Sequence, residues 1–153
     1  MASVFDVAKY VLRRCGKRDA WSLQKLCWYA QGHHGAWTGR ALFDEDFEAW
    51  RGGPVCYELN RSRGDKFVLS EDDLPQGDPG ALTRDERESL DIVLERYGKL
   101  KPYELRDAVR EETSWSEARK GVAPDSPNGP VIPKESIFAS FAEDIENVRE
   151  VVR

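Results

Sequence analysis

The residues with the most evident chemical potential are a cysteine and two histidines in the segment 22–34. Cys27 and His34 are seven residues apart, which places them on one side of a helix, and His33 is adjacent. A thiol beside an imidazole suggests a nucleophile with its base, as in a small hydrolase of phage origin. The other residues on that side are aliphatic: Leu23, Leu26 and Ala30. Because no third residue is placed to orient a histidine, we expect Cys27 to be a core residue and predict no catalytic residues.

Metal and cofactor sites are also not predicted. The two histidines lack the third and fourth ligands of a zinc site, and no Cys-x-x-Cys or His-x-x-x-His spacing accompanies them. Gly52 and Gly53 belong to no phosphate-binding glycine motif, so we interpret them as turn residues. The acidic residues between 44 and 48 are typical of a solvated face. They are Asp44, Glu45, Asp46 and Glu48.

The same segment carries a second pattern of possible functional importance. Gln24, Trp28 and Gln31 repeat at i, i+4 and i+7, away from the aliphatic side of the predicted helix. Tryptophan is enriched at the energetic centres of protein interfaces. We therefore expect these three side chains to form an exposed surface that another protein covers.

Helical periodicity and capping signals dominate the rest of the chain. We expect helices over 4–15, capped by Ser3, and from Asp19 to about Trp37. Thr83 and Glu86 form a capping box before a helix ending at Gly98, and Pro102 opens another. A short helical turn follows residue 113, and residues 121–133 form a loop. The last helix has these inward positions: Ile137, Phe138, Phe141, Ile145 and Val148.

The β content is expected to be small. Residues 46–51 alternate briefly before a Gly-Gly-Pro turn, and residues 66–69 have the composition of a pairing strand. The prediction is a mainly α, compact single-domain bundle over 1–153, with about six helices and a β-hairpin near residues 46–69.

Composition restricts the class of partner. The chain has 153 residues and a formal net charge of −5, which disfavours general affinity for nucleic acid and favours a basic partner. A basic cluster at the end of the first helix keeps a nucleic-acid-binding regulator as an alternative: Arg13, Arg14, Lys17 and Arg18. No apolar run is long enough for a membrane span, and the three cysteines lack metal-ligand spacing, so we expect a cytoplasmic protein.

Two motifs resemble the Panacea domain antitoxins, also called SocA-like antitoxins and described as phage-associated proteins. They are LQKLCWYAQGHH, residues 23–34, and LFDEDFEAWRGGPV, residues 42–55. Supporting similarity follows in YELRDA, ETSWSEAR and IPKESIFASF. The motif positions expected to be structural are Leu23, Leu26, Tyr29, Gly53, Pro54, Val55 and Trp115.

The resemblance implies a mainly helical antitoxin, with no enzymatic activity, that neutralises a cognate toxin encoded in the same operon. Together with the tryptophan pattern, it gives the following partner-binding set: Gln24, Lys25, Trp28, Gln31, Trp50 and Arg119. Delivery of the toxin to a protease and homo-oligomerisation are left open. Several relatives carry an additional DNA-binding module for which this chain has no room, so we do not expect it to repress its own operon.

Overall fold

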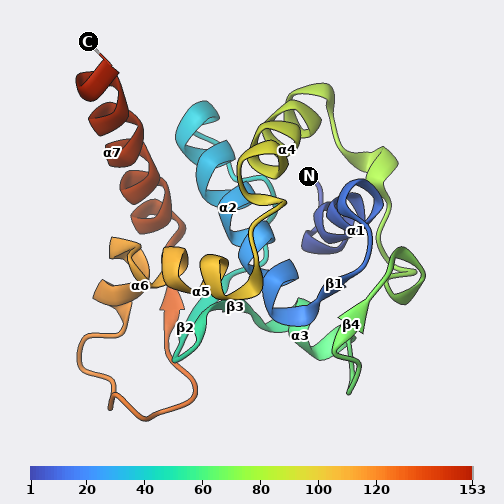
Figure 1. Ribbon diagram of the computed structural model, residues 1–153, viewed down its shortest axis with the longest axis horizontal. Helices are drawn as coiled ribbons and strands as arrows, with labels where there is room; N and C mark the ends of the chain where they lie inside the picture. The colour runs from blue at the N-terminus through green and yellow to red at the C-terminus, as the bar shows by residue number, and fades with distance from the viewer. Residues whose placement is uncertain (153) are drawn as a thin grey trace.

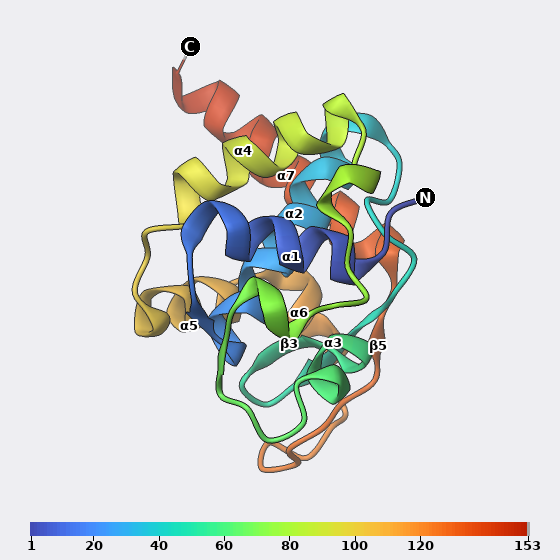
Figure 2. The ribbon, with the colours of Figure 1, turned by 90° about the vertical axis from the view of Figure 1, so that its right-hand side faces the viewer.

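Helix α2, Ala20–Thr38, occupies the centre of the protein. The computed structural model describes residues 1–152, with side-chain surroundings described for 1–143. Figures 1 and 2 show α2 between α1, Val4–Cys15, and α7, Lys134–Val152. It also packs against α4, Arg84–Tyr97, and α5, Pro102–Arg110. Every residue from 22 to 35 is buried, because neighbouring elements surround this helix.

The ends of α1 and α2 follow the expected capping chemistry. The Ser3 hydroxyl accepts a hydrogen bond from the Asp6 backbone N–H, and the Asp6 carboxylate accepts one from the Ser3 N–H. The Asp19 carboxylate accepts from Ser22 N at 3.0 Å and caps α2. Helix α2 ends before Gly39, which adopts a left-handed conformation with φ 74°.

Gly32 and Gly35 allow α7 to approach α2 closely. A Cβ atom at Gly32 would overlap the Phe141 ring, and one at Gly35 would overlap the Phe138 ring. Phe138 and Phe141 were expected to face inward and do so; Ile145 and Val148 lie outside the residues whose side chains are described. The two glycines therefore provide the space that lets the rings of α7 pack against α2.

The main sheet has three antiparallel strands in the order β3-β2-β5. Strand β2, Phe47–Trp50, pairs with β3, Gly53–Cys56, and on its other side with β5, Val131–Ile132. Pro54 is compatible with β3 because this strand lies at the edge. Residues 68–69 form β4 and pair with β1, residues 18–19. The expected pairing partner for 46–51 was therefore wrong, because the Gly-Gly turn brings the adjacent segment 53–56 beside it.

The mainly α prediction is confirmed. The described residues contain seven α-helices, one more than the approximate number expected. The remaining ones are α3, Tyr57–Ser62, and α6, Thr113–Ala118; short 3₁₀ turns cover Glu71–Asp73 and Pro79–Ala81. The Thr83 and Glu86 capping box of α4 forms as expected. No described helix has an apolar stretch long enough to cross a bilayer.

Candidate functional site

Two buried glutamines join α2 to the chain that follows it. The Gln24 side-chain amide donates to Cys56 O at 3.0 Å and accepts from Cys56 N at 2.8 Å. Gln31 makes the equivalent pair, donating to Phe43 O at 2.8 Å and accepting from Leu42 N at 2.7 Å. Each amide thus acts as a peptide group would in a sheet ladder, and satisfies backbone atoms that are buried. Together they hold residues 42–56 against the helix.

Trp28 fills the space between these two glutamines. Its ring is fully buried and makes edge contacts with Phe47 and Phe141, at centroid distances of 5.3 and 6.0 Å. The indole Nε1 has no hydrogen-bond partner within the described part of the chain. Trp28 is therefore a core residue that connects α2, β2 and α7.

The prediction that Gln24, Trp28 and Gln31 form an exposed surface is wrong. Their exposed fractions are 2%, 0% and 0%. The physical reason is that β2, β3 and α7 cover the side of α2 that the aliphatic pattern leaves free, and the glutamine amides find their partners in that covering chain.

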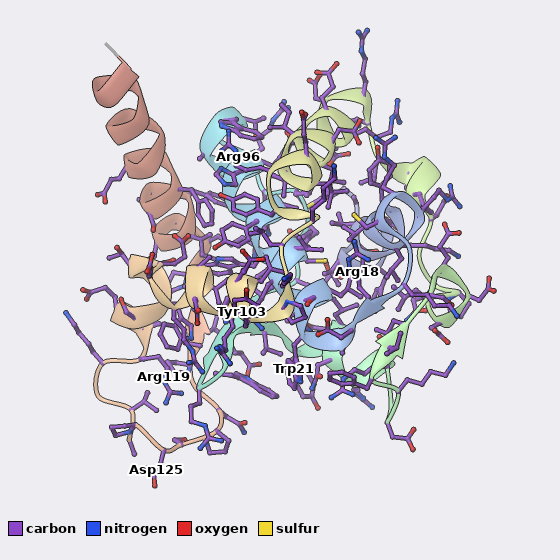
Figure 3. All side chains as sticks on the ribbon, viewed as in Figure 1. Arg18, Trp21, Arg96, Tyr103, Arg119 and Asp125 are labelled. Atoms are coloured by element: carbon purple, nitrogen blue, oxygen red, sulfur yellow. The ribbon has the colours of Figure 1, made fainter. Side chains whose placement is uncertain are left out.

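The surface region with the character of a binding site lies beside the start of α2. A groove of about 790 Å³ runs between this helix end, the β2–β3 turn and α5. Four aromatic side chains line it: Trp21, Trp50, Phe67 and Tyr103. Figure 3 labels Trp21, on α2, and Tyr103, on α5. Phe67 and Tyr103 are 54% and 53% exposed, so two of the four rings are open to solvent at this surface.

The groove is basic although the chain as a whole is acidic. Its lining includes four cationic side chains, Lys25, Arg51, Arg106 and Arg110, and one carboxylate, Asp19. Arg106 is paired with Asp107 at 3.3 Å, and Arg51 donates to Asp125 O at 3.4 Å. An anionic ligand group would therefore meet an attractive local field here.

Lys25 lies at the base of this groove and is 7% exposed. Its Nζ donates to Trp21 O at 3.4 Å, and it forms no salt bridge with any described carboxylate. Burial lowers the pKa of Lys25; Asp19 opposes this shift, and Arg110 and Arg106 add to it. An ammonium group has three donors, so Lys25 retains capacity for an incoming acceptor.

Trp50 is held in place by two hydrogen bonds. Its indole Nε1 donates to Glu48 Oε1 at 3.0 Å, while its backbone carbonyl accepts from Trp115 Nε1 at 2.8 Å. The turn after it requires Gly53, whose φ is 133° and where an added Cβ atom would meet the side chains of Val109 and Lys25. Of the predicted partner-binding residues, Lys25 and Trp50 are the two that line the groove.

Arg119 has a different environment from the one expected. Its guanidinium is half-buried and donates to five backbone carbonyls, those of Ala49, Ala123, Pro124, Ser126 and Asn128. These bonds connect β2 to the loop 119–130, which Figure 3 shows between the labels of Arg119 and Asp125. That Arg119 contacts a partner stays a prediction; in this structure the long loop uses the guanidinium to satisfy its own carbonyl groups.

The other motif positions lie in the scaffold. Leu23, Leu26 and Tyr29 are at most 1% exposed, and the Tyr29 ring stacks on Tyr97 at a centroid distance of 4.0 Å. Pro54 and Val55 are buried in β3 and also line the groove. The motif thus builds both the core and one wall of the groove.

The cysteine and the histidines are engaged elsewhere. Burial raises the pKa of Cys27, and raises that of Cys56 to about 12, so neither thiol is activated as a thiolate. His34 Nδ1 hydrogen-bonds Ser89 Oγ at 2.8 Å, and His33 Nε2 hydrogen-bonds the Tyr97 hydroxyl at 3.0 Å. This geometry favours the core interpretation of these residues. Within the described residues, no group of three metal-ligating side chains is found.

Internal contacts also occupy the charged segments noted in the sequence. Arg13 pairs with Glu71, Arg14 with Asp91, and Arg18 donates to Gly98 O. In the acidic run, Glu45 accepts from Val4 N, and Asp46 pairs with Lys134. These contacts reduce the charge that either segment offers to a nucleic acid or to a basic protein.

Besides Arg51 in the β2–β3 turn, the groove residues that sequence reasoning missed are Trp21, Phe67, Tyr103, Arg106 and Arg110. They come from α2, from the segment before β4, and from α5. Tyr103 and Arg106 stand in the YELRDA motif, which was noted as a similarity without a role. Only the packing of α5 against α2 and β3 brings them beside Lys25 and Trp50.

Comparison with known proteins gives one match. The family model described as "Antitoxin SocA-like, Panacea domain" matches residues 23–116, more than half of the chain. That segment contains both buried glutamines, the β2–β3 hairpin and α5. No curated protein and no solved structure matches.

Proposed function

Because this chain belongs to the SocA-like antitoxin family with a Panacea domain, we propose that it is an antitoxin that neutralises a protein toxin by binding it directly. The family match is the observation that carries this proposal. The toxin is proposed to be the product of an adjacent gene in the same operon, and both proteins to act in the cytoplasm. The antitoxin role requires no catalytic group of its own.

The groove beside α2 is the proposed contact surface. Partly exposed aromatic rings around basic side chains are characteristic of residues that dominate binding energy at interfaces. Trp50 and Lys25 belong to the matched segment and line this groove. A standard interface buries about 1,600 Å² in total, so contacts would extend beyond the groove onto the surrounding surface.

Co-expression with the adjacent gene tests the proposal. The product of that gene is expected to arrest growth when expressed alone, and the arrest is expected to be relieved by this chain. The two purified proteins should elute together in size-exclusion chromatography. A toxin that still arrests growth beside soluble, abundant antitoxin would contradict the proposal.

Toxin half-life separates two ways of neutralising. Direct blocking leaves the half-life of the toxin unchanged or longer when the antitoxin is present. Delivery to a protease shortens it, and this shortening disappears in a strain that lacks the protease.

A further inference from the structure

The strongest unexplained feature of the molecule is a buried lysine with little to bind. Removing an ammonium group from water is unfavourable unless it gains strong partners. Lys25 is 7% exposed, and its described hydrogen bond is a long one of 3.4 Å to Trp21 O. The adjacent Gln24 is also buried, yet its amide both donates and accepts in bonds of 3.0 Å or less. The contrast suggests that the partner of Lys25 comes from another molecule.

The surroundings of Lys25 indicate the charge of that partner. Arg106 and Arg110 face the groove from α5, and both lower the pKa of Lys25 through charge repulsion. The negative charge of Asp19 raises the pKa of Lys25, but the Asp19 carboxylate already caps α2 by accepting a hydrogen bond from Ser22 N. A carboxylate in the groove would accept from Lys25 and relieve the repulsion among the three cations.

The groove walls indicate what accompanies the carboxylate. Trp21 and Trp50 are half-buried and line the groove from α2 and β2, and the more exposed Tyr103 and Phe67 line it from α5 and from the segment before β4. Rings on several sides of a groove bury an apolar or aromatic side chain in the geometries that such rings prefer. A volume of about 790 Å³ accommodates a few residues of extended chain.

We propose that this groove binds an extended acidic segment of the partner protein, with an Asp or Glu carboxylate on Lys25 and Arg110 and an adjacent apolar side chain between Trp21, Trp50 and Tyr103. The inference rests on the proposed function, since the partner segment would belong to the toxin. It differs from the expectation of a basic partner, which follows from the net charge of −5 and ignores the local charge of the groove. Because the side chains that line the groove are mostly cationic, an acidic segment complements their charge.

A displayed library of random twelve-residue peptides, panned against the intact chain, tests the groove without the toxin. Enriched peptides should carry Asp or Glu within two positions of Trp, Phe, Tyr or Leu. In fluorescence anisotropy, one such peptide should lose about tenfold or more in affinity with Lys25→Met and with Arg110→Glu. Changing the acidic residue of the peptide to its amide should have a similar effect.

Arg61→Glu is the matched control, because Arg61 is exposed on α3 and does not line the groove. Its effect on peptide affinity should stay within about twofold. Selected peptides without acidic residues, or peptides that bind Arg110→Glu as tightly as the wild type, would overturn the proposal. ATP or inorganic phosphate that displaces the peptide at micromolar concentration, and loses binding with Lys25→Met, would also overturn it in favour of a phosphate-ligand pocket.

Failure of this inference is distinguishable from failure of the proposed function. If the wild type, Lys25→Met and Arg110→Glu all relieve toxin arrest equally, the antitoxin role stands and the groove assignment is lost. If the wild type does not relieve arrest, the antitoxin role fails, and the peptide affinities still decide the chemistry of the groove. Urea unfolding midpoints confirm that each variant is folded.

Discussion

Gln24 and Lys25 are neighbours on α2 that are both buried, but their polar groups differ in how fully they are hydrogen-bonded. The Gln24 amide completes both hydrogen-bonding groups of Cys56, so its burial supports the fold. The Lys25 ammonium has a single long bond and lies at the base of a basic, aromatic groove. Burial alone therefore does not distinguish a structural polar residue from a binding one; the number and quality of its partners do.

The same difference in how fully buried polar groups are hydrogen-bonded separates two larger regions of the molecule. The interior region contains Gln24, Trp28 and Gln31, which join α2 to residues 42–56. The groove region contains Lys25, Trp50 and Tyr103, which border open space. Changes in the interior region should reduce stability, whereas changes in the groove region should leave stability nearly intact and reduce binding.

The largest contrast is expected between Trp28→Ala and Tyr103→Ala. Trp28→Ala leaves a cavity between α2, β2 and α7 and should lower the free energy of unfolding by about 3–5 kcal/mol. Tyr103 is 53% exposed, so Tyr103→Ala should change it by no more than about 0.5 kcal/mol. Urea unfolding followed by circular dichroism measures both values. Equal losses for the two variants would remove the distinction between the regions.

The next effect concerns the amide pairs. Gln24→Leu introduces an apolar side chain of similar size, leaves the buried Cys56 N–H without its partner and removes one donor to the Cys56 C=O, which should cost about 2–4 kcal/mol. Gln76→Leu is the control, because Gln76 is exposed in a loop. The unfolding free energies of the two variants should differ by most of that amount. A Gln24→Leu protein as stable as the control would mean that the hydrogen bonds between Gln24 and Cys56 contribute little to the free energy of unfolding.

A pH titration sharpens the same comparison through His33, which is 4% exposed on α2. Burial lowers the pKa of His33 from 6.5 to about 4, and Arg96 adds to this shift. Since the folded pKa lies below the unfolded one, the stabilising contribution is fully present above about pH 6.5 and is lost as the pH falls toward 4. We expect a loss of about 3 kcal/mol over this interval, measured by urea unfolding at each pH.

His33→Gln provides the control for that titration. The variant lacks the imidazole, so its stability should decline less steeply than that of the wild type between pH 6.5 and pH 4. Parallel declines would show that other groups account for the acid sensitivity.

The smallest effect on stability is expected at Lys25. Lys25→Met removes a buried charge whose partners are weak, so the free energy of unfolding should stay unchanged or rise by about 1 kcal/mol. Peptide or toxin binding should fall in the same variant. A loss of stability near that of Gln24→Leu would place Lys25 with the interior region and undermine the proposed carboxylate site.

The sequence by itself determined the elements whose signals are local. The Ser3, Asp19 and Thr83 caps and the helical spacing of apolar residues specify where α1, α2 and α4 begin. A capping side chain reaches only the first turn of its own helix, so neighbouring residues contain the whole cause. The motifs around Leu23 and Trp50 likewise identified the family later matched over residues 23–116.

The tertiary structure alone decided which polar residues are interior and which border the groove. Gln24 and Lys25 follow one another, and nothing local separates their roles, because their surroundings are supplied by β3 and α5. The periodic pattern of α2 shows one apolar side, but a central helix is covered on every side, so its polar residues become buried wherever distant backbone groups match them. The exposure of a side chain and the hydrogen bonds that it makes depend on the residues packed around it. Those residues come together only when the chain folds.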